Sequence, residues 1–239
     1  MTNLKELVIA AHGGQERWKA FERVTVDLQQ GGALWSLKGQ PHTLETTSVT
    51  VGLRKQWASH FPFGSDGLRS TFEPDRVALA AVDGSIVQEL ANPRESFAWH
   101  VLQTPWDQLQ LAYFAGCAMW TYLNMPFLLA WPGVETEELE PWPTAAGAWR
   151  RLTVRLPASI ATHSPVQTLY VDADGLLKRH DYDVQIAGNT PGAHLVSDYV
   201  DVSGIKFPTK RRIFARQGDG GYAAEPLVVS IDLSNFQLE

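Results

Sequence analysis

The chain has 239 residues, of which 44% are apolar and 19% charged, and 20 Lys and Arg against 26 Asp and Glu give a formal net charge of -6. A nucleic-acid-binding surface normally carries a basic excess on one face, so we expect no nucleic-acid partner. The only cysteine, Cys117, excludes an internal disulfide and a thiolate zinc cluster. No linker-like stretch divides the chain, so we predict a single domain over residues 1–239.

The N-terminal segment does not have the pattern of a secretory signal peptide. Lys5 and Glu6 stand where such a peptide needs an apolar core, and the apolar run over residues 7–11 is too short for that role. The sequence therefore predicts a cytoplasmic protein.

Residues 108–134 carry no charge and are numerous enough to cross a bilayer. Several polar residues interrupt them, however, and the flanking charges, Asp107 and Glu135, are acidic rather than basic. We therefore expect no membrane span and predict a helix over about residues 105–124 that is buried in protein. Thr104 is its expected N-cap, with Pro105 in the first helical position.

Residues 3–21 have the apolar spacing of an N-terminal helix, which Gly13 and Gly14 divide into two short helices or kink into one bent helix. Most of the remaining chain has the alternation of strands, including a long strand over residues 24–37. Residues 131–149 are rich in proline and acidic residues and predict a surface connection. The sequence thus predicts an α+β fold: a strongly curved antiparallel half-barrel of about ten strands, wrapped around a buried apolar helix, with an additional N-terminal helix.

This order of elements resembles the lipoprotein-carrier (LolA-like) fold family. The segment AAHGGQERWKAF before a long strand, and QTLYVDADGLLKRHDYDV followed by SDYVDVSGIKFPTKRR, are similar to uncharacterised cytoplasmic bacterial relatives of that fold. The resemblance implies a half-barrel that closes over helices and leaves an apolar cavity.

One strand combines apolar and ionisable side chains in a pattern that suggests chemistry. Alternation over residues 176–186 places His180 and Tyr182 on the inward face and Arg179 and Asp181 on the solvent face. A hairpin centred near residue 189 sets His180 opposite Asp198, and cross-strand partners have Cβ atoms about 4.5–5.5 Å apart. A carboxylate that orients an imidazole makes a general base, but the same pair also fits a purely structural polar contact.

Further candidates surround this pair. A hairpin centre between residues 203 and 204 turns Arg211 inward beside Asp198, where it anchors a ligand carboxylate or carbonyl, or pairs with Asp198. The same register separates His180 from His194 by roughly 13 Å, which is too far for one metal ion. We therefore expect no metal and no cofactor. The remaining candidate ligand-binding residues are aromatic or histidine side chains near apolar surface: Tyr113, Trp120, Tyr122, His100 and His163.

Together these residues favour a cofactor-independent enzyme that acts by proton transfer on a small hydrophobic or aromatic ligand, as an isomerase, cyclase or lyase. His180 is the expected base, Asp198 orients it, and Tyr182 or Arg211 polarises an oxygen. The alternative is a non-catalytic binding or carrier protein for a hydrophobic small molecule. The sequence leaves the oligomeric state open.

Overall fold

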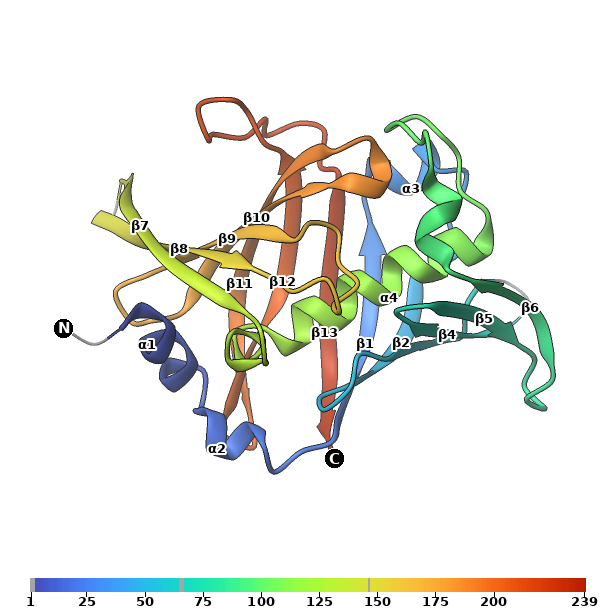
Figure 1. Cartoon of the computed structure of the whole chain (residues 1–239), viewed down its shortest axis with the longest axis horizontal. Coiled ribbons are helices and arrows are strands. Elements are labelled where there is room, and N and C mark those ends of the chain that lie inside the picture. Colours follow the sequence, from blue (N-terminus) through green and yellow to red (C-terminus); the bar gives the residue numbers. More distant parts are fainter. Residues whose placement is uncertain (1–2, 65–66, 146) are drawn as a thin grey trace.

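Thirteen antiparallel strands form one curved, unclosed sheet around a central helix (Figure 1). The computed structural model describes residues 3–64, 67–145 and 147–239. The sheet order is β6-β5-β4-β3-β2-β1-β13-β12-β11-β10-β9-β8-β7, so β6 and β7 are its two edges. This arrangement confirms the predicted fold class, although the sheet has more strands than the expected ten.

The strands are β1 (Arg23–Gly31), β2 (Thr46–Gly52), β3 (Ala58–Phe61), β4 (Arg69–Glu73), β5 (Arg76–Ala80), β6 (Ile86–Ala91), β7 (Glu135–Thr144), β8 (Gly147–Arg155), β9 (Val166–Val171), β10 (Leu177–Val184), β11 (Thr190–Val202), β12 (Ile205–Ala215) and β13 (Val229–Leu238). The helices are α1 (Leu4–Ala11), α2 (Gln15–Trp18), α3 (Ala33–Leu37) and α4 (Gln108–Asn124), with 3-10 turns η1 (Pro93–Phe97), η2 (Phe127–Ala130) and η3 (Gln185–Ala187). The N-terminal pattern therefore forms two short helices, α1 and α2, rather than one bent helix.

The central helix α4 lies across the concave face of the sheet and is buried from residue 110 to its end (Figure 1). It starts later than predicted: Asp107 is the N-cap, and its side chain and that of Gln110 form a reciprocal capping box. Gly116 allows close packing on β4, since a Cβ at this position would lie 2.3 Å from the Cβ and Cγ atoms of Phe72. Within the described residues, no helix has the length and apolar character to cross a membrane.

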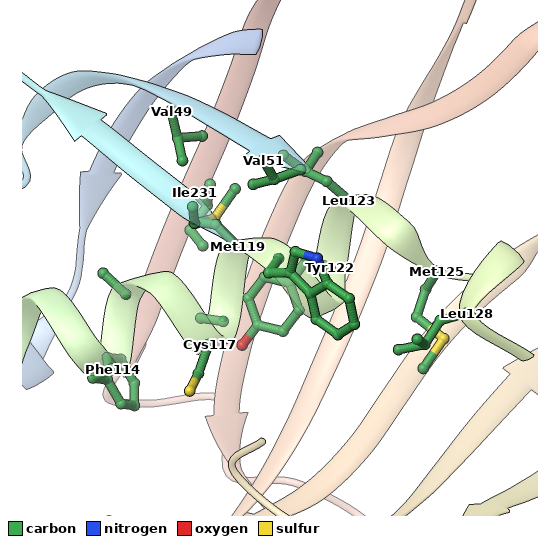
Figure 2. Packing of buried hydrophobic residues seen from close by; sticks show 14 of the residues in the cluster. Val49, Val51, Phe114, Cys117, Met119, Tyr122, Leu123, Met125, Leu128 and Ile231 are labelled. Atoms are coloured by element: carbon green, nitrogen blue, oxygen red, sulfur yellow. The ribbon is translucent and has the colours of Figure 1, made fainter. Parts of the chain in front are cut away.

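Apolar side chains fill the space between α4 and the sheet. Figure 2 shows Met119 on α4 with Val49, Val51 and Ile231 of the sheet, all of them buried members of one apolar cluster. The indole of Trp120 donates hydrogen bonds to the carbonyl oxygens of residues 52 and 55, at 2.9 and 3.1 Å. These contacts fix the helix to the turn between β2 and β3.

The predicted long strand over residues 24–37 was wrong in its second half. Strand β1 ends at Gly31, and the short helix α3 follows, because Gly32 has φ 111° and turns the chain against β13. A Cβ on Gly32 would lie 2.4 Å from the carbonyl oxygen of Val228, so only glycine fits this turn. The buried side chains of Leu34 and Trp35 then point toward the interior.

The segment 131–149 is not only a connection, because it contains strand β7. Pro141 and Pro143 lack a backbone N–H and would break a central strand. They are tolerated here since β7 is an edge strand, paired only with β8. Proline and acidic residues also protect such an edge from pairing with another chain.

Candidate functional site

An apolar cavity of about 320 Å³ lies between α4, α3 and the concave face of the sheet. Its lining combines α3, α4, β10 to β13 and the loop before α4; its large apolar contributors include Trp35, Trp106, Phe114, Met119, Phe214 and Ile231. Tyr122 and Tyr182 also line it. A mostly apolar, partly enclosed space of this kind is typical of sites for small hydrophobic ligands.

Lys38 stabilises the loop before α4, which covers one side of the cavity. Its ammonium group donates hydrogen bonds to the carbonyl oxygens of Leu102, Thr104 and Val101, at 2.6, 3.0 and 3.4 Å. It also lies 4.3 Å from the ring centre of Trp106. The side chain is fully buried, and burial lowers the pKa of Lys38 to about 8. Since Leu102 and Trp106 line the cavity, Lys38 ties α3 and this wall together.

We expect the substitution Lys38→Met to loosen this loop, because it keeps the apolar stem but removes every hydrogen bond of the ammonium group. Amide hydrogen exchange at Val101 and Thr104 should accelerate at least about tenfold, and bound apolar ligand should dissociate faster. The exposed Lys206→Met is the matched control, with unchanged exchange in this loop. Equal exchange in both variants would show that Lys38 does not hold the loop.

The predicted His180–Asp198 dyad is absent. His180 pairs across the hairpin with His194, not with Asp198. Asp198 is exposed on the far part of β11 and forms an ion pair with Lys210 at 2.5 Å. Its backbone has φ 57°, which breaks the inward alternation of the strand. Asp198 therefore cannot orient His180.

The register error has a physical cause in the turn. Residues 185–189 connect Val184 to Thr190, so the hairpin is centred at residue 187 rather than 189. Pro191 and Gly192 have the composition of a turn, but they lie within β11, where Pro191 pairs with Asp183. The pairing of β10 with β11 is therefore displaced from the predicted pairing by an even number of residues. The inward faces are preserved, but every cross-strand partner changes.

His180 faces α4 but lacks the properties of a general base. Its Nε2 donates a hydrogen bond to Oε1 of Gln167 at 2.6 Å. Burial, helped by the charge of Arg211, lowers the pKa of His180 to about 3. An imidazole with this pKa is a weak proton acceptor near neutral pH. The rings of His180 and His194 are 5.9 Å apart, much closer than predicted.

Tyr122, Tyr182 and His194 form a hydrogen-bonded chain beside the cavity. The hydroxyl groups of Tyr122 and Tyr182 bond to each other, and the Tyr182 hydroxyl lies 3.4 Å from Nδ1 of His194. Burial raises the pKa of Tyr122 to about 12 and holds the pKa of His194 well below its usual value, with Arg211 adding to the latter effect. All three groups are therefore uncharged at neutral pH.

Arg211 turns inward, as alternation predicts, but it does not pair with Asp198. Its Nη2 donates to the backbone oxygen of Tyr122 at 3.0 Å, and its guanidinium carbon lies 5.1 Å from the ring centre of Tyr122. Among the described residues, no carboxylate forms an ion pair with it. It lies next to Tyr122 without lining the cavity itself. Ligand anchoring by Arg211 stays a prediction.

The other candidate residues lie around the cavity rather than in its wall. Tyr113 packs on Phe72, and Trp120 bonds to the turn after β2. His100 lies in the loop before α4, next to Phe97. His163 stacks on Phe114, with ring centres 4.4 Å apart, and neither of its nitrogens has a partner among the described residues. Burial lowers the pKa of His163 to about 3.

Sequence reasoning missed the contribution of α3 and Lys38. The adjacent glycines, Gly31 and Gly32, are a signal that the strand ends, and the segment ALWSL after them fits a helix as well as a strand. No local pattern distinguishes the buried Lys38 from a surface lysine, because its partners are backbone carbonyls distant in sequence.

The outer face of β10 is not the solvent face that was predicted. Arg179 and Asp181 are buried there and form a bidentate pair at 2.6 and 2.8 Å. Tyr170 lies under the guanidinium group, and the loop that contains Gly220 accepts a hydrogen bond from Arg179. Trp142 of β7 also lies against Arg179, with its ring centre 5.8 Å from the guanidinium carbon. Local alternation alone does not reveal that these distant segments cover the strand. Within the described residues, no three His, Cys, Asp or Glu side chains are placed to hold a metal ion.

Solved structures with the same architecture define the fold class. A LolA superfamily protein from Nitrosomonas europaea superposes with a TM-score of 0.52 at 10% identity, covering 97% of this chain and 92% of that chain. A lipoprotein-sorting protein domain from Vibrio parahaemolyticus gives a TM-score of 0.51 at 11% identity, covering 99% and 94%. The protein has the LolA-like fold. No family model and no curated protein matches its sequence.

Proposed function

We propose that this protein binds a small hydrophobic molecule in the cavity and carries it without chemical change. The observation that supports this most strongly is the cavity of about 320 Å³, enclosed by α3, α4 and the sheet and lined almost wholly by apolar side chains. Burial of apolar ligand surface in such a space supplies the binding free energy.

The expectation of a proton-transfer enzyme is wrong. Asp198 is exposed and paired with Lys210, so His180 has no orienting carboxylate. The Vibrio parahaemolyticus structure, which has the same fold, is described as an outer membrane lipoprotein-sorting protein domain. Both findings favour the alternative interpretation of the sequence, a binding or carrier protein.

Tryptophan fluorescence tests the proposal, because Trp35 and Trp106 line the cavity. We expect saturable changes in emission on titration with medium-chain alkanes or small polycyclic aromatics. The double variant Trp35→Phe/Trp106→Phe should lose most of this change. The control Trp99→Phe should retain it, since Trp99 is 98% exposed. The absence of any saturable response in the folded protein would refute the proposal.

A further inference from the structure

If the protein binds a ligand in the cavity, as proposed, one place in the cavity wall is suited to a polar group of that ligand. Tyr122 from α4 and Tyr182 from β10 both line the cavity, and their hydroxyl groups are bonded to each other. Small-ligand sites commonly combine apolar walls with a few polar groups that fix orientation. The positions of the hydroxyl protons in this cluster determine whether the ligand group must donate or accept a hydrogen bond.

A proton count leaves one donor without a protein partner. The cluster holds two hydroxyl protons and, since His194 is neutral, one imidazole proton. Two hydrogen bonds join the three groups, so one proton remains. Nε2 of His194 is buried with no partner among the described residues. An unpaired buried N–H costs more than an unpaired acceptor, which places the imidazole proton on Nδ1.

With this tautomer of His194, the donor and the acceptor of each hydrogen bond in the cluster are determined. Nδ1 of His194 donates to the Tyr182 oxygen, and the Tyr182 hydroxyl donates to the Tyr122 oxygen. The Tyr122 hydroxyl proton is then the one left over, on a side chain that lines the cavity. Tyr122 therefore offers a donor to a ligand.

The charge of Arg211 adds a preference for an electron-rich acceptor. Its guanidinium group lies 5.1 Å from the Tyr122 ring centre and is buried. No carboxylate among the described residues compensates it. A buried charge without a counter-charge favours negative potential nearby. A carbonyl or carboxylate oxygen of the ligand, bound at the Tyr122 hydroxyl, supplies this negative potential.

The cavity volume limits the size of the ligand. A cavity of about 150 Å³ holds benzene, so the roughly 320 Å³ here suits about twelve non-hydrogen atoms. This corresponds to one medium-length alkyl chain or a compact ring system. A lipid with two or three long acyl chains needs a multiple of this volume.

We infer that the ligand is a compact, single-chain or ring molecule of about twelve non-hydrogen atoms, with one carbonyl or carboxylate oxygen that accepts the Tyr122 hydroxyl proton. Decanoate, methyl nonyl ketone and dodecane are suitable probes, because they match in size and differ only in the oxygen group. The first two distinguish an anionic from a neutral acceptor.

The test is isothermal titration of the folded wild-type protein, Tyr122→Phe and Tyr113→Phe with each probe. Tyr113→Phe is the matched control, since Tyr113 is a buried tyrosine of the same helix that does not line the cavity. We expect Tyr122→Phe to weaken the binding of at least one oxygenated probe by about tenfold while dodecane binding persists. Tyr113→Phe should leave the affinity for all three probes unchanged.

An unchanged affinity of Tyr122→Phe for both oxygenated probes, with dodecane binding retained, would overturn the inference and leave the proposed function intact. Binding of a two-chain phospholipid as tightly as the best probe would overturn the size limit. No binding of any probe by the folded wild type would instead refute the proposed function itself.

Discussion

Mild acid should unfold this protein. Five histidines are buried, and burial is the main reason that their pKa values are low: about 4 for His12 and His60, about 3 for His163 and His180, and well below the usual value for His194. Their ordinary pKa is 6.5. Below that pH the unfolded chain takes up protons that the folded chain does not. The stability is therefore fully present above pH 6.5 and is lost as the pH falls toward the folded-state values.

The expected magnitude is large. At one pH unit below the pKa in the unfolded chain, each buried histidine lowers the free energy of unfolding by about 1.4 kcal/mol. Five together cost about 7 kcal/mol, which is comparable to the whole stability of a typical domain. Urea denaturation followed by circular dichroism at pH 7.5 and 5.5 measures this difference.

Single variants separate this effect from general acid sensitivity. His163→Phe should raise stability and remove about one proton from the uptake on unfolding, because the His163 ring stacks on Phe114 and its nitrogens lack described partners. His42→Gln, a substitution of an exposed histidine, is the matched control. A wild-type stability that changes by less than about 2 kcal/mol between these pH values would contradict the assignment.

Asp181→Ala should be the most destabilising charge removal at neutral pH. The Asp181 and Arg179 side chains are only 6% and 3% exposed, and Tyr170 donates a further hydrogen bond to the carboxylate at 3.0 Å. Removal of Asp181 leaves a buried guanidinium without a counter-charge, which costs about 3–5 kcal/mol. Equilibrium denaturation measures the loss.

Two comparisons make this result specific. Glu89→Ala removes a carboxylate from the exposed ion pair with Arg76 and should cost less than about 1 kcal/mol. The double variant Arg179→Met/Asp181→Leu replaces the buried pair by apolar side chains and should recover most of the loss. A cost for Asp181→Ala no larger than that for Glu89→Ala would show that the buried pair does not stabilise the fold.

The sequence predicts the architecture well because the architecture depends on local patterns. The uncharged run before Asn124 marks the buried helix, and alternation places His180, Tyr182 and Arg211 on the inner face. These features need only the periodicities of helix and strand, which survive an error in pairing. The fold class is therefore correct although β7 and α3 were missed.

The site was predictable only in part, because it depends on which strands meet and in what register. Tyr122 and Tyr182 are both predicted site residues and both line the cavity. The dyad failed since a turn centred two residues earlier changes every partner of His180. The burial of Arg179 and Lys38 depends on loops far away in sequence, to which they donate hydrogen bonds. No alternation pattern contains that information.

If an apolar ligand occupies the cavity, a large side chain placed inside the cavity must prevent its binding. Ala118 on α4 lines the cavity, and Ala118→Trp would fill much of it. The measurement is the dissociation constant for naphthalene by isothermal titration, with Ala158→Trp on an exposed loop as control. We predict saturable binding by the wild type and by Ala158→Trp, and none by a folded Ala118→Trp. Equal binding by Ala118→Trp and the wild type would show that the ligand binds outside this cavity.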